Sequence, residues 1–218
     1  MKPAAWDGVY RDGRDLYTVN RTPGSKVYGE TLKAADGVEY RAWDPFRSKL
    51  AALLLKGPPS DLLGRPKTVL YLGAAHGTTV SHLSDAFPEA TIFAIEKSPT
   101  SFAPLLALAR RRPGLVPILA DAQLPERYQA DVGPVDLLYQ DVAQRNQAGI
   151  FVENARACLV PGGRGLLMLK VRSVTQRRPT SVVVQEARRA LSADRLTVTY
   201  ETPLSPFARE HVALAVES

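Results

Sequence analysis

The sequence has one cysteine and no long hydrophobic run, and each absence excludes a class of protein. Cys158 has no partner in the chain for a disulfide, and no cysteine cluster suggests structural zinc, so we expect a reducing compartment and no metal site. Lys170 and Arg172 interrupt the most apolar stretch, which therefore falls short of the roughly 18 apolar residues of a membrane span. The first 17 residues lack the apolar core of a secretory signal. We expect a cytoplasmic protein with no membrane partner.

The composition is that of an ordinary globular protein, with a basic balance of charge. Hydrophobic residues make up 45% of the 218 residues and charged residues 23%. The chain has 28 lysines and arginines against 22 acidic residues, a net charge of +6 and a pI near 9.5. This balance favours a polyanionic partner such as nucleic acid, although a merely solvated basic surface has the same charge.

The first 55 residues differ from the rest of the chain. Asp12-Gly13 and Asp36-Gly37 separate short stretches with the spacing of β-hairpins. A helix is predicted over 48–56, where Gly57-Pro58-Pro59 ends it. We therefore predict a small β-hairpin region at 1–55 and a second domain at 56–218.

From residue 68 onward, apolar runs of strand length alternate with helical patterns. This alternation predicts an α/β fold with a doubly wound, mainly parallel sheet. No helical pattern separates the last two runs, so they are expected to close the sheet as an antiparallel pair. The predicted strands are 68–72, 91–95, 115–119, 135–139, 165–169, 196–200 and 211–216, and the helices are 78–86, 100–111, 147–159 and 181–191.

In such a sheet the ligand binds at the carboxyl ends of the strands, and several of these ends are acidic. The loop 73–79 is rich in small residues but lacks the patterns that bind phosphate. Glu96 follows Gly77 by nineteen residues, a separation at which an acid accepts hydrogen bonds from ribose hydroxyls. Asp121 and Asp141 follow the next two predicted strands. Each acid alone fits a surface or capping residue, but together they indicate a nucleoside cofactor without phosphates, namely S-adenosylmethionine.

A series of motifs runs in order over nearly the whole chain. They are the segments 43–50, 69–79, 81–85, 95–99, 117–122, 141–144, 170–173 and His211. In this order and spacing they resemble the archaeal fibrillarin family. The resemblance implies a class I S-adenosylmethionine-dependent methyltransferase with a Rossmann-like, mainly parallel seven-stranded sheet. It implies methyl transfer to ribose 2′-hydroxyls of pre-rRNA and tRNA, directed by a guide RNA in a box C/D particle. The implied partners are guide and target RNA, a Nop-family scaffold protein and a kink-turn-binding ribosomal-type protein.

The resemblance also assigns site residues. Two positions depart from the family: Lys97 stands where an aromatic residue is common, and His76 where a smaller residue is common. A catalytically silent scaffold subunit and a stand-alone methyltransferase for a protein side chain or small molecule remain as alternatives. The implied cofactor contacts are Ala75, Thr78, Thr79, Glu96, Lys97, Asp121, Ala122, Asp141, Val142, Ala143 and Gln144, and the implied catalytic tetrad is Lys49, Asp141, Lys170 and His211.

Within the tetrad, Lys170 is expected to accept the proton of the 2′-hydroxyl. Lys49 would favour the neutral amine of Lys170 and help hold the ribose or phosphate. Asp141 would orient the amines, and His211 would position the hydroxyl or Lys170.

Other cationic and polar residues outside the tetrad receive simpler predictions. Arg172, Arg177 and Arg178 are expected on a loop after Lys170, in contact with RNA phosphates. The run 110–112 is expected to be a solvated basic helix end. His82 and Cys158 are expected to be packing residues.

Overall fold

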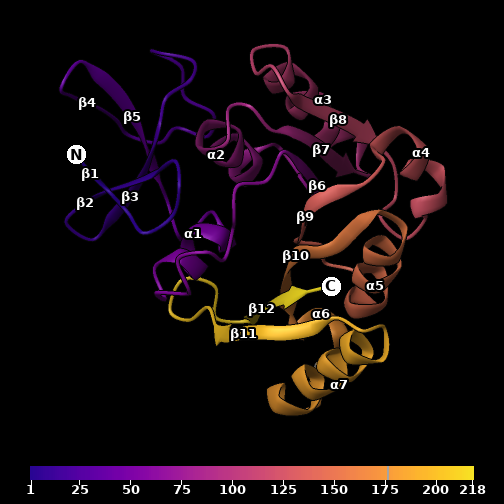
Figure 1. Cartoon of the computed structure of the whole chain (residues 1–218). Coiled ribbons are helices and arrows are strands. Elements are labelled where there is room, and N and C mark those ends of the chain that lie inside the picture. The colour runs from indigo at the N-terminus through magenta and orange to yellow at the C-terminus, as the bar shows by residue number, and fades with distance from the viewer. Residues whose placement is uncertain (176) are drawn as a thin grey trace.

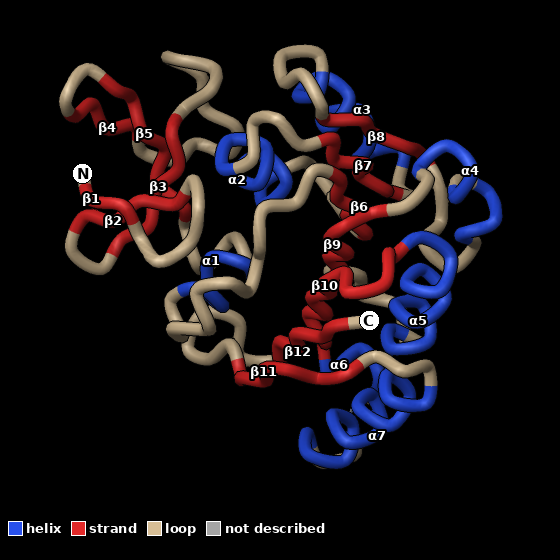
Figure 2. Tube along the Cα trace, viewed as in Figure 1, coloured by secondary structure: helices blue, strands red, loops and turns tan. Residues whose placement is uncertain are grey.

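The computed structural model describes residues 1–175 and 177–218, and a twisted seven-stranded sheet runs through its centre (Figure 2). The strand order is β11-β12-β10-β9-β6-β7-β8, and the five strands from β10 to β8 are parallel. β12 pairs antiparallel with β10, and β11 with β12, so the predicted sheet is confirmed. The strands are β6 (Thr68–Leu72), β7 (Thr91–Glu96), β8 (Leu115–Leu119), β9 (Val135–Gln140), β10 (Leu159–Lys170), β11 (Thr197–Pro203) and β12 (His211–Glu217).

Helices cover both faces of this sheet (Figure 1). Phe151 of α5 and Leu191 of α7 belong to the core on one face. Leu83 of α2 and Leu105 of α3 belong to the core on the other. The helices after β6 are α2 (Thr78–Ala86), α3 (Pro99–Ala109), α4 (Gln129–Val132), α5 (Gln147–Cys158), α6 (Val171–Val174) and α7 (Thr180–Ala193), with a 3-10 turn η1 (Pro125–Arg127). Within the described residues, none of the helices is long and apolar enough to cross a membrane.

The amino-terminal region forms a separate antiparallel sheet, as the hairpin spacing predicts. Its strand order is β1-β2-β3-β5-β4, and the short helix α1 (Lys49–Leu54) follows it. Trp6, Leu16 and Trp43 from this region share one hydrophobic core with Leu83 of α2, so this sheet packs on α2. The division of the chain at residues 55 and 56 stays a prediction. The strands are β1 (Lys2–Pro3), β2 (Val9–Asp12), β3 (Asp15–Val19), β4 (Leu32–Ala35) and β5 (Val38–Trp43).

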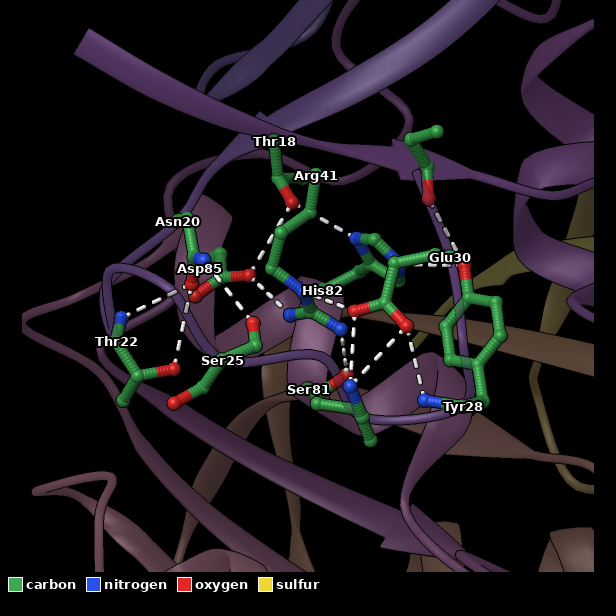
Figure 3. A network of polar contacts seen from close by, with 12 residues as sticks. Thr18, Asn20, Thr22, Ser25, Tyr28, Glu30, Arg41, Ser81, His82 and Asp85 are labelled. Carbon is green, nitrogen blue, oxygen red and sulfur yellow. Dashed lines mark hydrogen bonds and ion pairs between the residues drawn. The ribbon is translucent and has the colours of Figure 1, made fainter. Parts of the chain in front are cut away.

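A buried charge network fixes the amino-terminal sheet to α2 (Figure 3). Arg41 of β5 donates to Glu30 (2.6 Å) and to Asp85 of α2, and Arg112 donates to the other oxygen of Asp85. All four side chains are at most 1% exposed. The network therefore holds two buried cations against two buried anions.

The prediction that Arg112 belongs to a solvated helix end is wrong. After α3 the chain turns, and the guanidinium of Arg112 is buried under α2, where it also donates to the backbone oxygen of Ser81 at 3.1 Å. Charge balance supplies the reason, because Arg41 alone does not neutralise the two buried anions Glu30 and Asp85. The partners lie 27 residues apart in the sequence, which hides the pairing from local patterns.

His82 lies beside this network and is buried, as predicted. Its two ring nitrogens lie 2.7 Å from the Thr18 hydroxyl and 2.8 Å from the Tyr28 hydroxyl, and its ring stacks on Trp43. Burial, together with the charges of Arg41 and Arg112, lowers the pKa of His82 well below its ordinary value. The ring is therefore neutral at pH 7 and adds no third cation.

We predict that Asp85→Asn lowers the free energy of unfolding by about 3 to 5 kcal/mol, because two buried guanidinium groups then share the single carboxylate of Glu30. Urea unfolding measures the difference. Asp7→Asn is the matched control, since Asp7 pairs with Arg65 on the exposed surface, and it should leave stability almost unchanged. Equal stability of the Asp85→Asn variant and the wild type would contradict this account.

Candidate active site

The loop after β6 passes very close to the end of β9. Gly73 has φ +83°, and a Cβ atom there would lie 2.4 Å from the backbone oxygen of Asp141. Gly73 donates its N–H to Ile95, and Asp141 donates its N–H to Leu72. Glycine is required at this position because the left-handed backbone and the close approach both exclude a side chain.

A cavity of about 370 Å³ opens at the carboxyl ends of β6, β7, β8 and β9. Its volume lies in the range of small-molecule sites. Eight of the eleven predicted cofactor residues line it, and Thr78, Thr79 and Asp121 do not. The lining residues are Ala75, Glu96, Lys97, Ala122, Asp141, Val142, Ala143 and Gln144 from the predicted set, with Gly73, Ile95, Ser101 and Ala120 in addition.

Of these four residues, Gly73 begins the small-residue loop 73–79 that the sequence points to, whereas Ile95, Ala120 and Ser101 were not expected as cofactor contacts. Ile95 and Ala120 stand directly before predicted positions, so an argument that includes strand-end neighbours would have found them. Ser101 lies in the first turn of α3, and no motif marks it.

The carboxylate of Glu96 is fixed by the backbone at the wall of the cavity. One oxygen accepts from the N–H of Ala75 at 2.9 Å and the other from the N–H of Ser98 at 2.7 Å. Each carboxylate oxygen has capacity for a second hydrogen bond. Glu96 is thus oriented by the protein and can still accept from a hydroxyl in the cavity.

Asp121 lies just behind the lining, where its own neighbours hold it. It accepts from Gln144 Nε2 at 2.8 Å and from the N–H of Gln123 at 3.0 Å, and Lys97 Nζ lies 3.8 Å away. Partial burial acts to raise the pKa of Asp121, but these hydrogen bonds and the Lys97 charge prevail and lower it. Asp121 is therefore an anion that holds the side chains of Lys97 and Gln144, both of which line the cavity.

Thr78 and Thr79 begin α2 directly after the cavity loop. Thr78 is half-buried. The hydroxyl of Thr79 is buried and donates to Ser48 Oγ at 3.0 Å, so this side chain is engaged away from the cavity.

The structure brings the four predicted tetrad residues to one edge of the sheet. Lys49 Nζ donates to Asp141 Oδ2 at 2.8 Å, and the two side chains are 29% and 17% exposed. Lys170 ends β10 and is the direct cross-strand partner of His211, the first residue of β12. The loop between β11 and β12, which leads to His211, lies beside α1, the helix that carries Lys49 (Figure 1).

Gln147 is a supporting residue that the sequence reasoning missed. Its side-chain amide donates to the backbone oxygen of Lys170 at 3.0 Å and accepts from the Lys170 N–H at 2.8 Å. Gln147 is 1% exposed and begins α5, so it fixes the end of β10 against that helix. A glutamine at a helix start carries no sequence signal for this role.

Burial and the two lysines set the charges in the tetrad. Burial raises the pKa of Asp141, and the charges of Lys49 and Lys170 offset part of that increase. Burial, with the same two lysines, lowers the pKa of His211 to about 4. His211 is therefore neutral at pH 7, and its buried Nδ1 has no hydrogen-bond partner in the described part of the chain.

The predicted RNA-binding arginines lie after Lys170 but differ in setting. Arg172 lies in the one-turn helix α6 and not on a loop, so that part of the prediction is wrong. The N–H of Val171 bonds to the backbone oxygen of Glu210, and Glu210 also lies 3.7 Å from Arg172. Arg177 is exposed, and Arg178 pairs with Glu186. Whether these arginines bind RNA stays a prediction.

Comparison with known proteins gives consistent matches. The family model described as Fibrillarin matches residues 2–218. A fibrillarin-like rRNA/tRNA 2′-O-methyltransferase of Methanosarcina barkeri is 45% identical over 214 residues, covering 95% of this chain and 94% of that protein. The crystal structure of Aeropyrum pernix fibrillarin with natively bound S-adenosyl-L-methionine has a TM-score of 0.90 and 40% identity, and covers 99% of this chain and 96% of that one. A fibrillarin solved in complex with Nop5p has a TM-score of 0.86 and 37% identity, and covers 99% of both chains.

We predict that Gly73→Ala impairs both folding and ligand binding. The added methyl group meets the backbone oxygen of Asp141, so the loop must move away from β9 and alter the cavity wall. The free energy of unfolding should fall by about 1 to 3 kcal/mol, and S-adenosylmethionine binding, measured by calorimetry, should weaken by at least about tenfold.

Gly37→Ala is the matched control for this substitution. Gly37 has φ +75° but no atom within 4 Å of an added Cβ, and it lies in the hairpin turn between β4 and β5. This variant should lose stability from backbone strain alone and bind the ligand normally. Normal binding by Gly73→Ala would show that the close approach does not shape the cavity.

Proposed function

Because the chain belongs to the fibrillarin family, we propose that it methylates ribose 2′-hydroxyls under the direction of a guide RNA, as the catalytic subunit of a box C/D particle. The chain is an RNA 2′-O-methyltransferase of the fibrillarin-like rRNA/tRNA type, and S-adenosylmethionine is its methyl donor. The observation that carries the proposal is the Lys49–Asp141 pair at the wall of a cavity whose other wall holds Glu96. The proposal goes beyond the rRNA/tRNA methyltransferase activity of the relatives in one respect, namely that a guide RNA within a particle selects the nucleotide.

The residues around the cavity fit S-adenosylmethionine. When bound, this cofactor supplies a methyl group on a positively charged sulfur. The apolar side chains of Ile95, Ala122 and Val142 suit a flat aromatic base, and Glu96 is oriented to accept from ribose hydroxyls. Asp121 is proposed to accept from the adenine amino group through Oδ2, because Oδ1 already accepts from Gln123 and Gln144 and Oδ2 accepts only from Gln123 Nε2, at 3.4 Å.

The tetrad is proposed to manage the proton of the 2′-hydroxyl. As the hydroxyl oxygen gains a methyl group it must lose its proton, and the proposed acceptor is the amine of Lys170, once that amine has given up its own proton to solvent. Neutral His211 is suited to donate its one ring N–H to the hydroxyl oxygen, which orients the hydroxyl while its single proton points to Lys170. Asp141 holds the ammonium of Lys49 at 2.8 Å, and this places a cation where a ribose or phosphate would lie.

We propose that this chain attracts RNA through its positive charge and that partner molecules select the target. The excess of six positive charges supplies sequence-independent attraction to phosphates, and exposed Arg145 and Arg177 lie on loops after β9 and α6. The Nop5p complex of a 37% identical relative supports a Nop-family scaffold as partner. The guide RNA and the kink-turn-binding protein are proposed from the family resemblance, and the cytoplasmic location is proposed from the sequence.

Reconstitution tests this function. The chain is mixed with a guide RNA, a Nop-family scaffold, a kink-turn-binding protein and a target RNA, and 2′-O-methylation is mapped by nucleotide. We expect methylation at the guide-selected nucleotide in the full mixture and almost none with the isolated chain. Cofactor binding without methylation would favour the silent scaffold, and efficient site-specific methylation by the isolated chain would favour a stand-alone enzyme.

We predict that Lys170→Ala slows single-turnover methyl transfer by about 10² to 10⁴ while S-adenosylmethionine binding stays nearly unchanged. Lys170→Arg should not restore the rate, because a guanidinium stays protonated and cannot accept a proton. Lys67→Ala is the control, since Lys67 is exposed and lies before β6, at the opposite end of the sheet. A Lys170→Arg variant that retains most of the rate would reduce the role of Lys170 to its charge.

A further inference from the structure

A buried hydrogen bond joins the helix that begins at the cofactor cavity to the residue before Lys49. Thr79 Oγ1 donates to Ser48 Oγ at 3.0 Å, and the two residues are 6% and 2% exposed. Thr79 is the second residue of α2, which starts where the loop 73–77 ends. The hydrogen bond therefore connects two segments that lie 31 residues apart in the sequence.

Ser48 also determines where α1 begins. It is the N-cap of α1, and its Oγ accepts from the N–H of Ala51 at 3.3 Å. Leu50, Leu53 and Leu54 bury α1 in the core, but they lie after the first residue of the helix, which is Lys49. Two backbone hydrogen bonds also hold the helix start, from the Ser48 N–H to Asp44 and from the Ala52 N–H to Ser48. Of the four hydrogen bonds of Ser48, the one to Thr79 connects the helix start, and with it Lys49, to α2.

These contacts close a ring around the site. Lys49 reaches Asp141 at 2.8 Å, and the backbone oxygen of Asp141 lies against Gly73, where the cavity loop begins. That loop leads to α2 and to Thr79. At Gly73 the cavity loop already lies against the backbone of Asp141, so it has no space to move closer. A shift of Thr79 relative to Ser48 should therefore change the distance between Lys49 and Asp141.

We propose that Thr79 and Ser48 are positioning residues, which hold the Lys49 ammonium at Asp141 and thereby place it for methyl transfer. This inference rests on the proposed function and goes beyond it, because it gives the Thr79 hydroxyl a role that acts through Lys49 and not through contact with S-adenosylmethionine. Neither Thr79 nor Ser48 lines the cavity. A displacement of about 1 Å at a reacting centre costs about 10²-fold in rate, so a single buried hydrogen bond can have a large effect here.

Thr79→Val and Thr79→Ser form the matched pair that tests the proposal. Valine keeps the branched shape and removes the hydroxyl, and Ser48 retains its bond to Ala51. In the reconstituted particle, Thr79→Val should slow single-turnover transfer by about 10- to 100-fold, and the Kd for S-adenosylmethionine should change by less than about threefold. Thr79→Ser keeps the donor and should transfer at nearly the wild-type rate.

Lys49→Ala separates action through Lys49 from a general structural effect. If Thr79 acts through Lys49, adding Thr79→Val to Lys49→Ala should slow transfer no further, because the two changes remove the same interaction. An equal slowing in both backgrounds would overturn the proposal. Weaker cofactor binding with an unchanged rate at saturation would overturn it too, and would restore Thr79 as a cofactor contact.

If Thr79→Val fails to fold, Ser48→Gly tests the proposal by removing the acceptor of the same hydrogen bond. Glycine is nearly as good an N-cap as serine but has no oxygen to accept from Thr79. It should reproduce the slowing and the non-additivity with Lys49→Ala, and wild-type rates in a folded Ser48→Gly particle would contradict the proposal. If the wild-type particle methylates no RNA, the proposed function is wrong. If the wild-type particle methylates RNA and the Thr79→Val particle does so at the same rate, only the positioning role of Thr79 is wrong.

Discussion

The buried carboxylate of Asp85 holds two arginines from separate parts of the chain, and the placement of the active site depends on this pairing. Arg41 comes from the amino-terminal sheet and Arg112 from the turn before β8. A buried charge that loses its partner is strongly unfavourable, so the sheet can dock on α2 in only one position. Because α1 follows this sheet directly, the same docking brings Lys49 to the end of β9. Thus α2 serves the fold at its carboxyl end through Asp85 and the site at its amino end through Thr79.

At the site itself, two lysines surround the carboxylate of Asp141, whose charged form is disfavoured by burial. The pKa of Asp141 rises on burial, and the charges of Lys49 and Lys170 limit the rise. Burial and the same two charges lower the pKa of His211 to about 4, so its imidazole stays neutral across the physiological range. The two lysines therefore affect the charge state of both other groups, and a substitution at Lys49 affects both Asp141 and His211. This interdependence makes non-additive effects the expected outcome of paired substitutions.

The parts of the molecule that follow from local pattern were predictable, and those that follow from distant pairing were not. Strand and helix alternation after residue 68 gave the sheet because each element has its own hydrophobic period. The strand-end acids Glu96 and Asp141 were found because their position after a strand is itself the signal. Arg112 was misjudged because its partner is distant in the sequence. The contact of Gln147 with Lys170 and the Ser48–Thr79 hydrogen bond could not be predicted for a similar reason. Serine, threonine and glutamine at helix starts usually have capping or surface roles, so their presence there does not indicate a distant partner.

Two charge clusters among the described residues, around Asp85 and around Asp141, differ in a way that bears on the silent-scaffold alternative. The Asp85 cluster is sealed from solvent, with two cations paired to two anions, as a structural cluster must be. The Lys49–Asp141 pair opens onto a cavity, and such partly exposed pairs contribute little to stability. An unpartnered buried nitrogen does not separate the two clusters, because both Arg112 Nε and His211 Nδ1 have no hydrogen-bond partner within the described residues. Stability gives little reason for the partly exposed Lys49–Asp141 pair, whereas a substrate hydroxyl that needs a fixed cation and a neutral imidazole beside it gives one.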